Sequence, residues 1–285
     1  MANAITLAQK FIPMLDAVYK NASLTAKLDG NPDLVQQGAN ANELIIPKMS
    51  MQGMADYDHN SGYVQGDVTL TNETVKCNYD RGRMFSVDTM DNLETAGIAF
   101  GNLAGEFIRT KVVPEVDAFR FAAYCTPEGV TKKQETLATG EQVLAALRAA
   151  TTTMDEAEVP AEDRHLFITP TLHGLIADLD TTKSRQVLDR FASVDLVPQS
   201  RFYTAVELVA GDAGGFRKAG GGAELNFMVL HKAALIQFDK HVAPKIVEPA
   251  NNPDADAYKF GYRLVGIADV YDNKAVGIYA SHKPA

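Results

Sequence analysis

The chain of 285 residues is poor in cysteine and has no long hydrophobic run. Its two cysteines, Cys77 and Cys125, lie far apart without further ligands at metal-binding spacing, which argues against a disulfide framework or a structural zinc site. No stretch approaches the ~18 apolar residues of a membrane-spanning helix, and the N-terminus lacks the basic start and apolar core of a signal peptide. We therefore expect a protein of a reducing cytoplasm that has no membrane contact.

Positive charge is also scarce. The chain has 27 lysine and arginine residues against 36 aspartate and glutamate residues, which gives a formal net charge of -9. Because nucleic acids are bound through clustered lysine and arginine, this balance argues against a general affinity for DNA or RNA. The hydrophobic share of 46% and the charged share of 22% are ordinary for a soluble globular protein.

Motifs that carry catalysis or bind cofactors are missing. Residues 215–220 have the glycine spacing of a phosphate-binding loop, but Gly221 and Gly222 stand where that loop needs Lys and Ser or Thr. Asp254 and Asp256 lack the glycine and the distal glutamate of a calcium loop, and the six histidines form no metal-binding pair. No Gly-x-Ser-x-Gly elbow is present. We expect no catalytic residue, no cofactor and no metal, and hence no enzyme.

The strongest positive feature is a long helical pattern over residues 90–124. Apolar residues recur every three or four positions from Leu93 to Ala123, with a single step of five between Phe107 and Val112. Asp88 and Thr89 precede the pattern and can cap the first free amides. Pro114 lies inside the pattern, so we expect a kink or break over residues 110–113 at a cost of roughly 3 kcal/mol.

Residues 43–87 have the alternation of β-strands instead of a helical period. The simplest account is a long hairpin whose polar tip covers residues 54–64. A two-stranded hairpin with so few apolar residues needs a surface to lie on, which is either its own domain or a second subunit. The tip combines polar groups with aromatic rings, so we expect Tyr57, Asp58 and Tyr63 to contact a neighbouring subunit.

The N-terminal residues 1–40 form an arm with one apolar helical face. Phe11 and Leu15 lie on this face, which packs either on its own domain or on a neighbouring subunit. At the other end of the hairpin, Asp80, Arg81, Arg83 and Asp88 flank its root. These four residues either pair across subunits or pin the hairpin to the long helix of the same chain, and the sequence leaves both open.

Helices and strands alternate after the long helix. The patterns predict a helix over 140–154, a buried strand over 165–169 and a helix over 170–179. Further strands are expected over 202–208, 225–230 and 233–238, with a mobile glycine-rich loop over 211–222. The last two strands, 262–270 and 275–279, are expected to form a hairpin around Asp272 and Asn273.

Three stretches resemble major capsid proteins of tailed bacteriophages, in the same order along the chain. They are residues 80–91 (DRGRMFSVDTMD), 105–120 (GEFIRTKVVPEVDAFR) and 251–263 (NNPDADAYKFGYR). The resemblance extends over about residues 45–279 and implies an α+β fold of the Hong Kong 97 type. Its parts are an N-terminal arm (1–40), an extended β-hairpin loop (41–87), a peripheral-domain spine helix (88–126), an axial domain (127–240) and peripheral C-terminal strands (241–285).

The resemblance also implies a function. Proteins of this family assemble through hexamers and pentamers into an icosahedral head that encloses double-stranded DNA without sequence-specific binding. The expected partners are further copies of the chain, a portal, decoration proteins, and a separate scaffold protein or none. The expected location is the virion capsid, after synthesis in the cytoplasm of the bacterial host. The alternative is the shell of a bacterial nanocompartment of the encapsulin type, which has the same fold.

Overall fold

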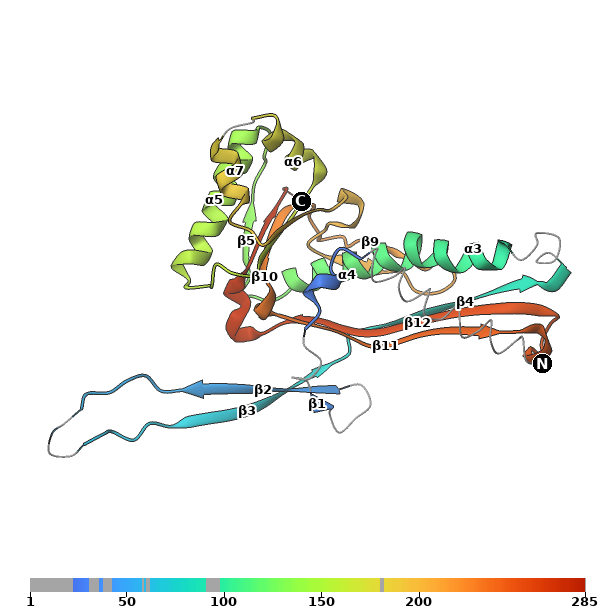
Figure 1. The fold of residues 1–285 in the computed structure, drawn as a ribbon, viewed down its shortest axis with the longest axis horizontal. Coiled ribbons are helices and arrows are strands. Elements are labelled where there is room, and N and C mark those ends of the chain that lie inside the picture. Colours follow the sequence, from blue (N-terminus) through green and yellow to red (C-terminus); the bar gives the residue numbers. More distant parts are fainter. Residues whose placement is uncertain are drawn as a thin grey trace. The chain divides into compact units, whose positions relative to one another are not determined.

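The computed structural model describes residues 23–30, 36–37, 43–57, 59, 62–90, 98–179 and 182–284. The chain divides into two compact units, of which the smaller covers residues 31–78 and the larger covers residues 1–30 and 79–285 (Figure 1). Phe11, Leu15 and Asp58, three of the predicted contact residues, lie outside the described residues. The same holds for residues 91–97 of the predicted long helix.

The smaller unit is built on a hairpin of β2 (Glu43–Met51) and β3 (Val68–Lys76). The two strands pair antiparallel without a register shift, from Glu43 opposite Lys76 to Met51 opposite Val68. The short strand β1 (Gln36–Gln37) adds to the free edge of β2. This arrangement confirms the long hairpin that the alternating pattern predicts, with a tip over residues 52–67.

One half of the larger unit is a five-stranded sheet covered by helices (Figure 1). Its helices α5, α6 and α7 form a hydrophobic cluster with the sheet. Thr139 and Gln142 form a capping box at the start of α5, which explains why the helix begins there. In spatial order the strands are β5 (Thr131–Gln134), β13 (Ile278–His282), β10 (Leu225–His231), β6 (Arg164–Ile168) and β7 (Ser193–Leu196), and the helices are α5 (Gly140–Glu156), α6 (Pro170–Ala177) and α7 (Thr182–Leu188).

The other half is a three-stranded antiparallel sheet of β11 (Leu235–Val247), β12 (Ala257–Val270) and β4 (Tyr79–Asp88). Strand β4 lies within the range expected for the extended loop, but it pairs with β12 along its whole length. The short strand β8 (Val206–Leu208) pairs with β9 (Phe216–Lys218), which lies inside the glycine-rich region. Short 3-10 turns connect elements elsewhere. The turns are η1 (Ala26–Leu28), η4 (Gln199–Arg201), η5 (Lys232–Ala234), η6 (Pro249–Asn251) and η7 (Asp272–Gly277).

The expected C-terminal hairpin is wrong. After β12 the turn η7 leads the chain out of the three-stranded sheet, and β13 pairs with β10 and β5 of the five-stranded sheet. Alternation locates the strand over 262–270, but residues 275–277 belong to η7 and the second strand begins only at Ile278. Alternation also contains no information on which sheet each strand joins. The strand expected over 202–208 is also shorter, because η4 precedes it and Tyr203 forms only an isolated bridge with Glu224 before β8 begins at Val206.

The long helix packs along the three-stranded sheet and is interrupted close to the predicted break over 110–113 (Figure 1). It consists of α3 (Ile98–Phe107), a π-helical turn η3 (Ile108–Val112) and α4 (Val113–Cys125). In the π turn the Val113 N–H donates to the Ile108 carbonyl, five residues back, which accounts for the step of five in the apolar pattern. Pro114 follows in the first turn of α4, where a missing N–H is tolerated best.

The apolar side chains of this helix contribute to two clusters of buried residues. Ile108, Val112 and Val116 pack with β4 and β12, whereas Phe121 lies near the five-stranded sheet with its ring 5.1 Å from that of Phe167 and 5.0 Å from that of Phe202. The long helix thus joins the hydrophobic cores of both sheets.

In the described part of the chain, no helix is long and apolar enough to cross a membrane.

Candidate assembly surfaces

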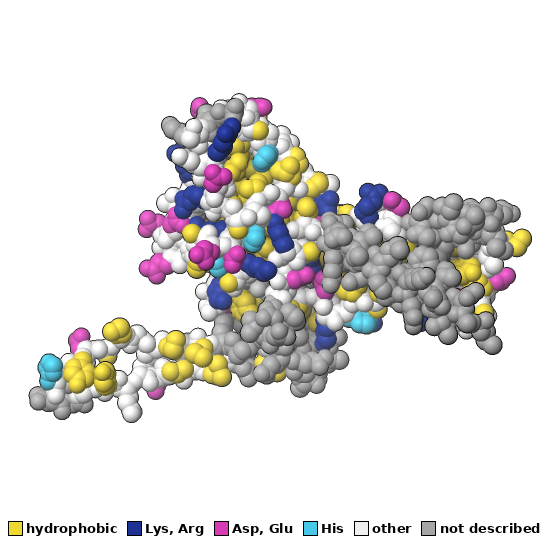
Figure 2. All heavy atoms as spheres, viewed as in Figure 1, with side chains coloured by type: hydrophobic (Ala, Val, Ile, Leu, Met, Phe, Trp, Pro, Cys, Tyr) yellow, Lys and Arg dark blue, Asp and Glu magenta, His cyan; other side chains and the backbone are white. Residues whose placement is uncertain are grey.

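One face of the hairpin carries exposed apolar side chains. Met49 lies opposite Leu70, and Met51 lies opposite Val68, with exposed fractions between 59% and 70%. Because alternate residues of a strand point to the same side, these four side chains share one face of the ribbon. Figure 2 shows hydrophobic side chains gathered along the hairpin. Soluble monomers rarely leave such a contiguous apolar surface uncovered, so this face is a candidate contact surface.

The tip of the hairpin brings two of the predicted contact residues together. The rings of Tyr57 and Tyr63 meet edge to face with centroids 4.9 Å apart, and the His59 ring lies 5.6 Å from that of Tyr57. Tyr63 is 89% exposed and Met54 is fully exposed. Large aromatic side chains that are held together in solvent are typical of interface residues.

The four charged residues at the root of the hairpin all have partners within the chain. The Arg263 guanidinium donates to both oxygens of Asp80, at 2.9 and 2.6 Å, and these hydrogen bonds hold the pKa of Asp80 below its usual value. Both side chains are about half exposed, so the pair contributes no more than about 1 kcal/mol. Asp88 accepts a hydrogen bond from the Met90 N–H at 2.8 Å and thereby caps a helical turn, as the sequence predicts.

Arg81 connects β4 to the helix and to the glycine-rich region. Its Nε donates to Glu115 Oε1 at 2.9 Å, and its Nη atoms donate to the carbonyls of Val209 and Gly215. The Tyr79 hydroxyl donates to the same Glu115 oxygen at 2.9 Å. Sequence reasoning missed Glu115, because it lies in the middle of a helix and far from Arg81 along the chain. The segment expected to be a mobile loop is therefore held at several backbone positions.

Arg83 and a glycine complete this junction. Arg83 Nη2 donates to the Asp212 carbonyl at 2.5 Å. Gly82 lies between the two arginines, where a Cβ atom would stand 2.9 Å from the Tyr262 carbonyl of β12, so only glycine allows this close approach of the strands. Contacts within one chain are thus observed for Asp80, Arg81, Arg83 and Asp88, and pairing across subunits stays a prediction for them.

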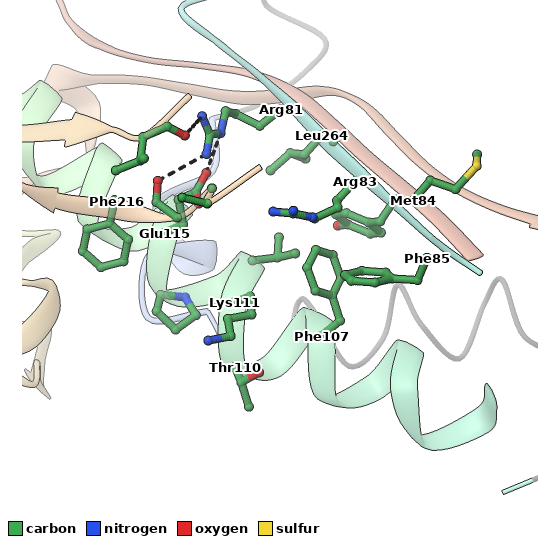
Figure 3. A pocket seen from close by; sticks show the side chains of 18 of the residues that line it. Arg81, Arg83, Met84, Phe85, Phe107, Thr110, Lys111, Glu115, Phe216 and Leu264 are labelled. Atoms are coloured by element: carbon green, nitrogen blue, oxygen red, sulfur yellow. Dashed lines mark hydrogen bonds and ion pairs between the residues drawn. The ribbon is translucent and has the colours of Figure 1, made fainter. Parts of the chain in front are cut away.

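A pocket of about 1130 Å³ lies between β4, the long helix and the glycine-rich region. Figure 3 shows Phe85, Phe107 and Phe216 around it together with the cationic side chains of Arg83 and Lys111. The rings of Phe85 and Phe107 are 4.7 Å apart at their centroids. The lining also contains a third cation and several acidic residues, so its charge does not favour an acidic ligand; these residues are Arg81, Asp80, Glu106, Glu115 and Asp212.

Within the described ranges, no group of three or more His, Cys, Asp or Glu side chains is arranged to hold a metal ion. Asp254 and Asp256 have other contacts, since Asp254 accepts from Lys259 Nζ at 2.6 Å and Asp256 accepts from the Thr89 hydroxyl at 2.9 Å. Their contacts are those of a structural turn.

The two arginines at the root should differ in their effect on stability. We expect Arg81→Ala to lower the free energy of unfolding by about 1–3 kcal/mol, because it leaves the nearly buried Glu115 carboxylate without its cation. Arg83→Ala should change it by less than about 0.5 kcal/mol, because this side chain is exposed. Urea unfolding of the unassembled subunit measures both. If Arg83→Ala also leaves the salt dependence of assembly unchanged, Arg83 does not pair across subunits.

Comparison with known proteins supports a specific fold. No protein-family model and no curated protein sequence matches the chain. Solved structures do match. A structure from Gordonia phage Cozz has a TM-score of 0.62 at 14% identity over 92% of this chain and 87% of that chain. The capsid structure of cyanophage P-SCSP1u has a TM-score of 0.59 at 11% identity over 87% of this chain and 85% of that chain.

A third match comes from an archaeal source. The virus-like particle from Pyrococcus furiosus has a TM-score of 0.61 at 12% identity, over 96% of this chain and 98% of that chain. The three matches cover between 85% and 98% of each chain, so the likeness extends over most of the fold. At these identities the likeness concerns the fold.

Proposed function

Because the chain has the Hong Kong 97-like capsid fold, we propose that it is the major capsid protein of a tailed bacteriophage. The copies assemble through hexamers and pentamers into an icosahedral head that encloses double-stranded DNA. The observation that carries this proposal is the combination of that fold with a hairpin whose apolar face and aromatic tip are exposed. The protein is made in the host cytoplasm and ends in the virion, and it performs no catalytic step.

The segments of the chain correspond to the arm, extended loop, peripheral domain and axial domain of the Hong Kong 97-like fold. The unit of residues 31–78 is the extended loop, and residues 1–30 contain the arm and its root. The three-stranded sheet with α3 and α4 is the peripheral domain. The five-stranded sheet with α5, α6 and α7 is the axial domain, and it includes β13 from the C-terminal end of the chain.

Assembly needs contacts that close into rings. A hairpin that binds a different surface of the next copy makes a heterologous contact, and such contacts form closed rings when the rotation between copies closes. The net charge of -9 suits a container, because an acidic wall does not adsorb the enclosed genome. A portal, decoration proteins and a separate scaffold protein, or none, are the further partners.

Particle formation tests this proposal directly. The purified protein, alone or with a scaffold protein, is expected to form capsomer rings or closed shells in negative-stain images and in light scattering. The reason is that the apolar face of the hairpin loses its contact with water only when a second copy covers it. A monodisperse monomer at high concentration over a range of salt would contradict the proposal.

A second candidate function is the shell of a protein compartment of the encapsulin type. The observation that favours it is the match to the virus-like particle from Pyrococcus furiosus over nearly the full length of both chains. The content of particles isolated from the native source separates the two candidates. Genomic DNA inside supports the phage head, and a bound cargo protein supports the compartment.

A further inference from the structure

The two sheets of the larger unit are joined at one place by two short connections. Turn η5 leads from β10 to β11, and turn η7 leads from β12 to β13. The two turns are held together, since the Tyr271 N–H donates to the Ala234 carbonyl at 3.0 Å and Lys274 Nζ donates to the Ala233 carbonyl at 3.2 Å. Two adjacent turns between two sheets have the geometry of a hinge.

The segment Ser23–Gly30 is inserted beside this hinge and binds the three-stranded sheet. Gln237 of β11 donates through Nε2 to the Thr25 carbonyl at 2.8 Å, and its own carbonyl accepts from the Gly30 N–H at 3.0 Å. Leu28 is 1% exposed and belongs to a hydrophobic cluster that contains residues of both sheets, among them Leu230 and Val270. The segment therefore contributes to the core of the junction.

The same segment is also bound to the five-stranded sheet. Lys27 forms an ion pair with Asp195 of β7, and its Nζ donates to Ser193 Oγ at 2.5 Å. Lys232 of the hinge turn η5 donates to the Lys27 carbonyl at 2.8 Å. Lys27 thus attaches the segment to the edge of this sheet and to the hinge itself.

The long helix supplies a third attachment through a buried carboxylate. Asp117 of α4 is fully buried and accepts from the hydroxyls of Ser23 at 2.8 Å and Thr25 at 2.7 Å, and from the backbone amides of Leu24 and Thr25. Arg201 forms an ion pair with Asp117, with its Nη1 3.2 Å from Oδ2. Removal of the hydrogen-bond donors from a buried carboxylate costs free energy, so the segment is held tightly at Thr25.

We propose that Ser23–Gly30 is a lock that fixes the angle between the two sheets of the subunit. Eight residues bind the helix and both sheets across the hinge, and together with the packing of the long helix on both sheets they prevent rotation about η5 and η7 while the segment is in place. The segment follows the arm and precedes the hairpin unit in the chain. The inference goes beyond the proposed function and does not depend on it, since it concerns motion within one subunit.

A double variant of the segment tests the lock in the full chain. Thr25→Val removes the hydroxyl that binds Asp117 and Arg120, and Lys27→Met removes the ammonium group but keeps the chain length. We expect the Leu24 and Gly30 amides to exchange hydrogen at least about tenfold faster. We also expect a broader distance distribution between spin labels on α5 and β11, introduced by Arg148→Cys and Lys245→Cys.

The labelling is specific and has a matched control. A Cys77→Ser background leaves Cys125, whose burial raises the pKa of its thiol to about 12, so this residue does not take the label. Dilution of labelled chains into unlabelled chains restricts the measurement to distances within one subunit. Lys283→Met removes a surface ion pair with Glu224 at 2.7 Å and should change neither readout.

The outcomes separate a lock from a segment that is merely docked. Faster exchange with an unchanged distance distribution would overturn the proposal, because the sheets would then keep their angle without the segment. Unchanged exchange would also overturn it. Thr25→Ser with Lys27→Arg keeps the hydroxyl and the cation and should restore both readouts. If the double variant loses its circular dichroism spectrum, Thr25→Val alone is measured against the same two outcomes.

Discussion

Replacement of residues 53–66 by Asn-Gly is expected to prevent shell assembly while each subunit stays folded. The tip contributes exposed side chains such as Met54, Tyr57 and Tyr63, and none of its described residues is buried. The backbone bond from the Gln52 N–H to the Asp67 carbonyl continues the ladder of β2 and β3 up to the tip. An Asn-Gly turn closes a two-residue hairpin at this position without changing the register.

The measurement compares folding with assembly in the same variant. Circular dichroism and urea unfolding should match the parent within about 0.5 kcal/mol, while negative-stain images should show monomers or loose capsomers. Tyr57→Phe with Tyr63→Phe keeps both rings and is the matched control, which should assemble. Normal shells from the shortened chain would show that the tip is not an assembly element. Loss of the fold would show that the hairpin packs on its own domain.

Removal of one residue from the spine helix is expected to be tolerated only at its π turn. Deletion of Arg109 brings Phe107 and Val112 to a spacing of four, so the apolar residues on both sides stay on the buried face of a regular α-helix. Arg109 is exposed and its ion pair with Glu106 is equally exposed, so little is lost with it. Pro114→Ala must accompany the deletion, because proline in a regular helix costs roughly 3 kcal/mol.

The same deletion in α5 is the matched control with the opposite expected result. Removal of Arg148 rotates the rest of that helix by about 100° and turns Ala150, Thr151 and Met154 away from the core. Displacement of a single large side chain such as Met154 costs about 2–5 kcal/mol, so this variant should lose most of its stability. Urea unfolding of both variants decides the matter. If both deletions lower the free energy of unfolding equally, the π turn does not arise from one extra residue in an α-helix.

Features with a short-range cause follow from the sequence alone. The capping residues at 139–142 and Pro170 locate the starts of α5 and α6. Alternation locates β2 and β3, and a short apolar run locates β6. The interruption of the spine follows from Pro114 and from the step of five that precedes it. Each of these signals depends on residues within one or two turns of each other, where local geometry decides the conformation.

Only the tertiary structure decided which distant residues meet. Strand β13 joins the five-stranded sheet instead of pairing with β12, and β4 joins the larger unit instead of the extended loop. Arg81 meets Glu115, and Asp117 meets Thr25, across long separations that leave no trace in the local pattern. Periodicity reports which face of an element is buried, whereas the choice of partner depends on the packing of the whole chain. The sequence therefore determined most helices and strands, whereas the fold determined the contacts that connect the segment Ser23–Gly30, the helix and the two sheets.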